Sequence, residues 1–189
     1  MTRTTRSVLW LALAILLLGS CARYTLVEPK PRTIADLYTV DPQTQWSATT
    51  FGKWEIWTVD GSGLEAVQFL TGLNDGQPLF QTADAQKRMK FQKSMSPSDL
   101  AELLADGLTS VGAQNVTITN LRPYRFGAAD GFRCELTFLN SYGLEKQGLA
   151  AGAAVNGRLY LVLYTGAKVH YYDAHRGEVE RIIESIRMR

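Results

Sequence analysis

Apolar and polar residues alternate along several short segments of the chain, and this two-residue period predicts β-strands. Residues 53–59 (KWEIWTV) carry apolar side chains on both faces, so we expect a strand that is covered on both sides. The Asp60–Gly63 segment (DGSG) predicts a turn, and the apolar residues at 64–70 predict the returning strand of a hairpin.

A polar loop over 71–87 separates this hairpin from a short basic segment at 88–93. Alternation in the basic segment predicts a further strand, with Met89 and Phe91 facing inward. Its charged residues would then form a solvated face that discourages pairing with other chains.

The second half of the chain contains a longer series of predicted strands. Residues 115–126, 132–139, 144–155 and 158–165 show strand patterning, and Asn156-Gly157 is a strong type I′ hairpin signal. The inward-facing side chains of the second of these strands are expected to be Phe132, Cys134, Leu136 and Phe138.

Two segments instead repeat their apolar residues at helical spacing. The first begins at Ser96, a good N-cap, continues with Pro97 and stops at Gly112, while the second spans 173–187. The apolar face of the second helix is formed by Val179, Ile182, Ile183 and Ile186. Sequential hairpins with two separated helices predict one α+β domain over residues 37–189, an antiparallel sheet sandwiched by helices.

The first twenty residues differ from the rest in composition. Arg3 and Arg6 precede an unbroken apolar run at 8–18, which is typical of a signal peptide and too short to span a bilayer comfortably. The following sequence, Leu18-Gly19-Ser20-Cys21, resembles the bacterial lipobox. The resemblance implies cleavage before Cys21 and diacylation of its sulfur.

We therefore expect residues 1–20 to be a lipoprotein signal peptide and residues 21–36 to be a lipidated N-terminus and flexible tether. Pro29 and Pro31 favour an extended conformation in the tether. Two acyl chains would hold the domain on a membrane of the cell envelope. Because Ala22 rather than aspartate follows the cysteine, the lipobox resemblance favours the outer membrane, facing the periplasm, in a source with two membranes.

The order of predicted elements over residues 38–187 also resembles the PsbP-like fold. The resemblance rests on the Ser96–Gly112 helix, the strand start at Gly131–Leu136 (GFRCEL), and the tyrosine-rich strand and final helix at Tyr160–Ile186. It implies an α/β/α sandwich and a binding role rather than chemistry. The photosystem and Ran-binding roles of known members are not carried over, because no positions here match their functional residues.

Charge and cysteine content narrow the class of function. The chain has a net charge of +2 at pH 7, and without Arg3 and Arg6 its basic and acidic residues are equal in number, so nucleic acid is not an expected partner. Once Cys21 is acylated, Cys134 is the remaining thiol, and no internal disulfide is expected. The place of Cys134 in an alternating strand predicts a buried, inert side chain.

Two sequence patterns resemble functional sites, one for a dinucleotide cofactor and one for a metal ion or hydrolysis. Gly61–Ala66 (GSGLEA) matches a dinucleotide-binding fingerprint formally, but the strand expected after it favours a hairpin turn. His170, Asp173 and His175 could approach one metal ion or form a hydrolytic site, yet their spacing is not a helical ligand pair, and we expect Asp173 to cap the final helix. No catalytic residue, metal or cofactor is therefore predicted.

The basic run at 87–93 could contact anionic lipid head groups or an acidic partner, although its alternation favours a solvated strand face. Most large aromatic residues are expected in the core. The residues assigned to a binding surface are Lys87, Arg88, Lys90, Lys93, Tyr171 and Tyr172.

These patterns together predict a membrane-anchored envelope lipoprotein that is not an enzyme. It would act by non-catalytic binding, as an accessory or scaffold protein with an envelope protein as partner. The alternative is a carrier that holds a small apolar ligand in a groove between sheet and helix. An enclosed apolar pocket of a few hundred Å³ would be the sign of a carrier.

Overall fold

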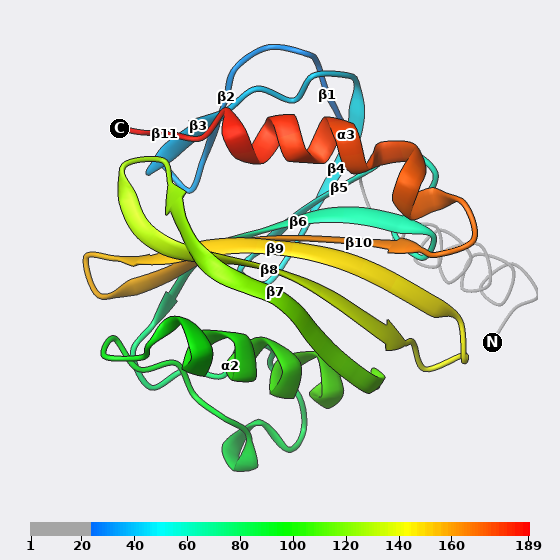
Figure 1. Cartoon of the computed structure of the whole chain (residues 1–189). Coiled ribbons are helices and arrows are strands. Elements are labelled where there is room, and N and C mark those ends of the chain that lie inside the picture. Colours follow the sequence, from blue (N-terminus) through cyan, green and yellow to red (C-terminus); the bar gives the residue numbers. More distant parts are fainter. Residues whose placement is uncertain (1–23) are drawn as a thin grey trace, which may run out of the picture.

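The computed structural model describes residues 24–189, so the predicted signal peptide and Cys21 lie outside the described part of the chain. An eight-stranded antiparallel sheet runs through the centre of the domain. Helix α2 (Pro97–Ser110) packs on one face of the sheet and helix α3 (Tyr171–Glu184) on the other (Figure 1). The α+β sandwich predicted from the order of strands and helices is therefore confirmed.

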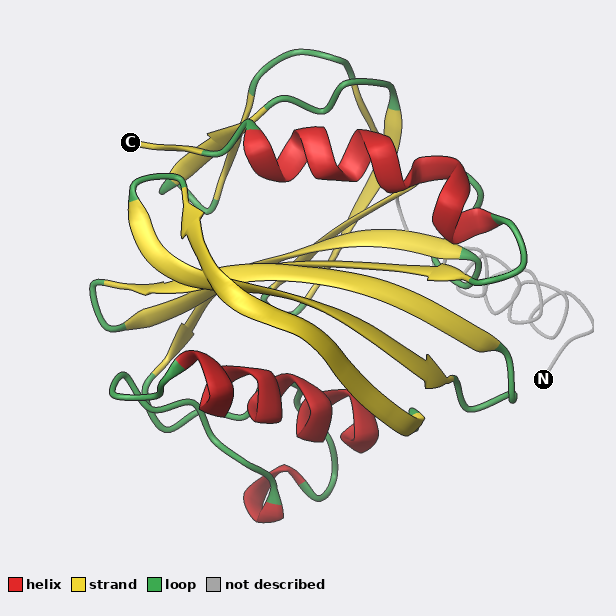
Figure 2. Cartoon of the chain, in the orientation of Figure 1, coloured by secondary structure: helices red, strands yellow, loops and turns green. Residues whose placement is uncertain are grey.

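The strands of the central sheet follow the order β1-β4-β5-β6-β10-β9-β8-β7. Their bounds are β1 (Thr25–Val27), β4 (Trp46–Phe51), β5 (Trp54–Thr58), β6 (Glu65–Asn74), β7 (Gln114–Phe126), β8 (Ala129–Leu139), β9 (Glu145–Val155) and β10 (Arg158–Ala167). A three-stranded sheet lies beside the C-terminal end of α3 (Figure 2) and has the order β11-β3-β2. Its strands are β2 (Arg32–Ile34), β3 (Tyr38–Val40) and β11 (Arg187–Met188).

Apolar side chains are buried on both faces of the central sheet. On the α3 side, aromatic residues of the strands pack against the four predicted apolar residues of the final helix, and all four are buried. On the α2 side, the leucines of α2 pack against the inward-facing residues of β8. These β8 residues are Phe132, Cys134, Leu136 and Phe138, as the alternation predicts.

Helix α2 begins where its local chemistry predicts. The Oγ of Ser96 accepts a hydrogen bond from the Asp99 backbone N–H at 3.3 Å, and Asp99 Oδ2 accepts one from the Ser96 N–H at 2.8 Å. This capping box satisfies two backbone donors at the start of the helix. Gly112 follows the helix with a φ of +93°, which allows the chain to turn back into β7. No helix in residues 24–189 is long and apolar enough to cross a membrane.

The structure corrects the prediction that residues 21–36 include a flexible tether. Strand β1 pairs with β4, and β2 pairs with β3. The side chains of Val27 and Ile34 are buried in the core on the α3 side. Pro29 and Pro31 do not prevent this pairing because they lie in the connection between β1 and β2, where no ladder hydrogen bond is required. The folded domain therefore begins about a dozen residues before the predicted boundary at residue 37.

Two smaller predictions are also wrong. The segment 88–93 is not a strand: Phe91 is buried as expected, but its backbone bonds to Gly76 and Gln77 in the preceding loop, and Met89 is exposed. Asp173 does not cap the final helix, because α3 already begins at Tyr171. For segment 88–93, the alternation correctly predicts that Phe91 is buried. It does not predict that this segment pairs with the loop before it instead of forming a strand.

The hairpin predicted at Asn156-Gly157 is confirmed, and it supplies a test of the backbone geometry. Both residues have positive φ, +51° and +75°, as a type I′ turn requires. We expect Gly157→Val to cost about 1–2 kcal/mol of unfolding free energy, because a branched side chain resists this conformation. The measurement is the melting temperature of the purified chain.

Gly63→Val is the matched control, because Gly63 lies in another exposed turn, has ordinary φ and has no atom within 4 Å of the added Cβ. It should leave the melting temperature nearly unchanged. Equal effects of the two substitutions would contradict the type I′ assignment.

Candidate functional site

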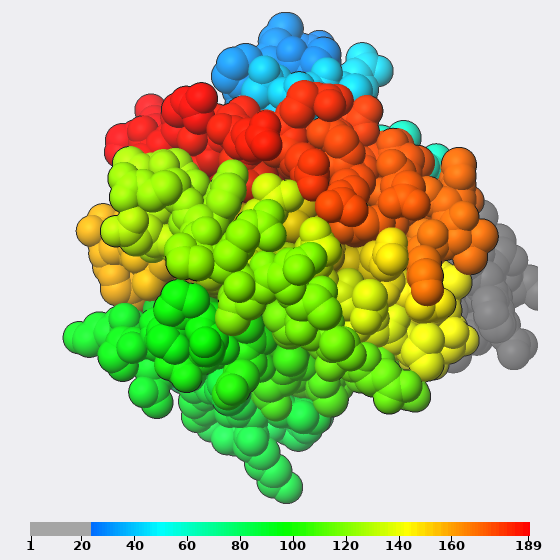
Figure 3. Space-filling view, in the orientation of Figure 1, coloured from blue at the N-terminus to red at the C-terminus, as the bar shows by residue number. Residues whose placement is uncertain are grey.

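An open apolar groove lies between the start of α2 and the sheet. Its volume is about 690 Å³. The α2 side contributes Met95, Pro97 and Leu100, and the sheet side contributes residues of β7, β8 and β9. In Figure 3 these segments meet at the left, where the green surface of α2 approaches the yellow-green and gold strands. The groove thus lies where the carrier hypothesis predicted one, between sheet and helix, but it opens to solvent instead of being enclosed.

The charged residues at the rim of the groove neutralise one another. Arg125 Nη1 and Asp130 Oδ1 are 2.6 Å apart across the β7–β8 hairpin, and both side chains are exposed. The phenol of Tyr124 is uncharged at pH 7, as tyrosines ordinarily are, and burial raises its pKa further. A groove without net charge and with an apolar lining suits an apolar ligand or an apolar side chain of a partner protein.

The predicted basic surface lies beneath α2. Lys87 ends a short 3₁₀ helix, η2 (Ala85–Lys87), and is exposed, as is Lys93. Arg88 is already paired, with its guanidinium 2.7 Å from Asp84 and 3.7 Å from Asp106 of α2. The Nζ of Lys90 donates to Gln86. Arg88 therefore links the loop to α2, whereas Lys87 and Lys93 stay exposed to solvent.

The two tyrosines predicted to share this surface lie elsewhere. Tyr171 and Tyr172 begin α3, on the opposite face of the sheet from α2 (Figure 1). Tyr172 is buried and stacks on Tyr164 with ring centroids 5.2 Å apart. The prediction of one surface containing both the basic run and Tyr172 is therefore wrong, because the sheet separates the two groups.

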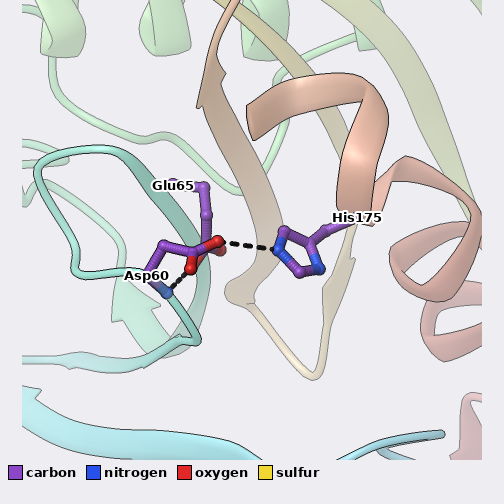
Figure 4. Close-up of side chains that lie close together, drawn as sticks. All are labelled: Asp60, Glu65 and His175. Atoms are coloured by element: carbon purple, nitrogen blue, oxygen red, sulfur yellow. Dashed lines mark hydrogen bonds and ion pairs between the residues drawn. The ribbon is translucent and has the colours of Figure 1, made fainter. Parts of the chain in front are cut away.

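A second candidate site gathers polar side chains where the β5–β6 turn meets the first turns of α3. Asp60, Glu65 and His175 each offer a ligand atom within 4.8 Å of the others (Figure 4). The Nε2 of His175 lies 3.1 Å from Asp60 Oδ2. The histidine is largely covered, and its ring centroid lies 5.8 Å from that of Trp46.

Glu65 is the buried member of this cluster, with no exposed surface. Its Oε1 accepts hydrogen bonds from the Thr58 hydroxyl at 2.6 Å and from the backbone N–H groups of Val59 at 2.6 Å and Asp60 at 3.0 Å. Its Oε2 is also buried and has no hydrogen-bond partner in the described part of the chain. The turn after β5 therefore orients one carboxylate oxygen firmly and leaves the other without a donor.

Lys146 brings a positive charge to the same end of the sheet. Its buried ammonium donates to the backbone oxygens of Gly63 at 2.8 Å and Leu64 at 2.9 Å. Burial lowers the pKa of Lys146, and the nearby Glu65 carboxylate opposes that shift. The side chain of Lys146 thus holds the β5–β6 turn in place through hydrogen bonds to the backbone of the turn.

The sequence pattern identified only one member of this cluster. The sequence placed His175 near His170 and Asp173 without predicting a site there, and in the structure it lies beside Asp60 and Glu65. Asp60 and His175 are 115 positions apart, so no local spacing could indicate the pair. A signal that could have been used is Glu65, a charged residue in a predicted apolar strand, because a buried carboxylate requires specific partners.

The antiparallel sheet with one helix on each face makes the described residues a single α+β sandwich domain. Among solved structures, the chain is similar to the solution structure of cyanobacterial PsbP (CyanoP) from Synechocystis sp. PCC 6803. The TM-score is 0.54 at 13% sequence identity, and the match covers 92% of this chain and 99% of that chain. The PsbP-like fold predicted from the sequence is therefore confirmed.

A looser similarity is to the crystal structure of LpqN, involved in cell envelope biogenesis of Mycobacterium tuberculosis. Its TM-score is 0.39 at 10% identity, with 90% of this chain and 87% of that chain covered. No protein-family model and no curated protein matched the sequence.

Cys134 provides a test of the core at the α2 face. Its side chain is fully buried, and burial raises the pKa of its thiol to about 12. At pH 8 almost none of this thiol would be ionised, and the thiolate is the form that alkylating reagents attack. We expect native Cys21→Ser protein to resist alkylation by iodoacetamide, as measured by intact-mass spectrometry.

The same protein in guanidinium chloride is the control, since unfolding exposes the thiol and should allow complete labelling. Rapid labelling of the native protein at pH 8 would contradict the buried position of Cys134.

Proposed function

We propose that this protein is a lipid-anchored protein of the cell envelope that acts by binding, as an accessory or scaffold protein. The observation that carries the proposal is the order of an apolar run, Leu18-Gly19-Ser20 and Cys21 directly before the folded domain. Strand β1 begins at Thr25, only four positions after the cysteine. Acylation of Cys21 would therefore hold the β1 edge of the sheet close to the lipid surface.

The outer surface near that edge favours contact with lipid. Tyr24 is 46% exposed, Leu26 is 62% exposed and Phe51 is 77% exposed. Leu26 is opposite Ser47 in the β1–β4 ladder, and Phe51 lies four positions further along β4, so both side chains project from the same face. Exposed apolar residues beside an acyl chain add to membrane affinity, because each removes further apolar surface from water.

The groove supports the binding role. Strand β1 lies at one edge of the central sheet, whereas β7, which lines the groove, lies at the other. A membrane at the β1 edge would leave the groove accessible to a partner with an apolar side chain. Ala22 after the cysteine supports the outer membrane, with the domain facing the periplasm, in a source with two membranes.

The anchor is tested by Cys21→Ser. We expect this change to abolish incorporation of a labelled fatty acid and to release the protein from the membrane fraction, because the acylated sulfur is lost. The measurement is metabolic labelling followed by separation of membrane and soluble fractions.

The control is Cys134→Ala, which removes the other cysteine from the core and should leave labelling unchanged. Persistent labelling of the Cys21→Ser protein would refute the anchor.

A second candidate function is the carrying of a small apolar molecule in the groove, which is favoured by the apolar lining and the volume of about 690 Å³. Ala154 is an exposed residue of the groove wall, so Ala154→Phe would fill the space. We expect it to weaken binding of the neutral dye N-phenyl-1-naphthylamine about tenfold, measured by fluorescence titration.

Ala83→Phe is the matched control, since Ala83 is exposed in the loop before η2 and does not line the groove. Dye binding that is unsaturable, or that is equally strong in both variants, would exclude the carrier function.

A further inference from the structure

We propose that Asp60, Glu65 and His175 form a binding site for one divalent transition-metal ion of the Zn²⁺ type. The three ligand atoms lie within 4.8 Å of one another and come from two elements distant in sequence (Figure 4). Two ligands bound tetrahedrally to Zn²⁺ are about 3.4 Å apart. The 3.1 Å between His175 Nε2 and Asp60 Oδ2 is close to this separation.

The second oxygen of Glu65 is an independent indication of a cation. Glu65 is completely buried, and its Oε2 accepts no hydrogen bond from any residue in the described part of the chain. A buried polar atom without a partner costs about 1–3 kcal/mol, so such atoms are rare in folded proteins. A metal ion would satisfy Oε2 without disturbing Oε1, which already has three donors.

The buried lysine does not provide this partner. The ammonium of Lys146 donates to the backbone oxygens of Gly63 and Leu64, both in the turn that carries the cluster. It helps to fix the position of Glu65 and leaves Oε2 available. The site therefore has a rigid, buried carboxylate and two more accessible ligands, Asp60 and His175, through which an ion could enter.

The chemistry of the three ligands selects the class of ion. Ca²⁺ and Mg²⁺ prefer oxygen ligands alone, whereas an imidazole nitrogen combined with carboxylate oxygens suits Zn²⁺ and its neighbours in the first transition row. Two carboxylates balance the charge of a divalent ion. Three protein ligands leave a fourth position for water or for a group on a partner.

An ion at this position would join the β5–β6 turn to α3. Asp60 and Glu65 flank that turn, and His175 lies in the first half of the helix. Binding to the folded state alone would raise the melting temperature with metal concentration. Trp46 would report the event, because its ring lies beside His175.

The experiment uses the full chain, purified from membranes in mild detergent without a polyhistidine tag and treated with a chelator. We expect ZnCl₂ to bind at one site per chain in calorimetric titration, to change tryptophan fluorescence and to raise the melting temperature. His175→Ala and Asp60→Asn should each weaken binding by about tenfold or more.

His170→Ala is the matched control, because His170 is the other histidine of the chain, is exposed and lies outside the cluster. It should retain wild-type affinity. Glu65→Gln tests the buried ligand if that variant folds. If it does not fold, the His175→Ala and Asp60→Asn variants test the site.

Absence of saturable Zn²⁺ binding, or an equal loss in the His170→Ala and His175→Ala proteins, would overturn the proposal. Equal binding of MgCl₂ or CaCl₂ would overturn the assignment to the Zn²⁺ class. The site does not depend on the lipid anchor, so the Cys21→Ser chain should bind Zn²⁺ with the same affinity.

Discussion

The central sheet carries apolar side chains on both faces, and most of the remaining structure serves to cover them. Helix α3 and the small β2-β3-β11 sheet cover one face with a cluster that contains Trp57, Tyr164 and Ile182. On the other face, α2 covers the β8 end, while Leu79 and Phe91 of the long loop cover the region of β5 and β6. Removal of these side chains from water is the dominant gain on folding, so each covering element is needed for stability.

Two apolar regions of the central sheet are not covered by a helix or a loop. On the α2 face, β1 and the end of β4 have no covering element, and Leu26 and Phe51 are left exposed there. The groove opens where α2 begins, because the helix does not reach the tip of the β9–β10 hairpin. The two apolar regions lie toward opposite edges of one sheet, which allows a single small domain to contact two different surroundings.

Local patterning predicted the elements with strong periodicity. Alternation identified the β8 side chains, and the capping residues at Ser96 identified the start of α2. It failed for β1 and β2, because strands of only three residues have no detectable period and owe their structure to partners elsewhere in the chain. The same limit applies to the Asp60–Glu65–His175 cluster, whose members are brought together only by the folded sheet and helix.

The position of β10 has a consequence for how the chain reaches its native state. This strand is synthesised after β6, β7, β8 and β9, yet it lies between β6 and β9 and joins β1, β4, β5 and β6 to the β7–β9 meander. Strand β11, which follows α3, then pairs with β3. A chain that emerges N-terminus first therefore presents the edge of β6 unpaired until β10 has been made. Such long-range pairing slows folding, and a chaperone that shields the β6 edge during this interval would reduce aggregation.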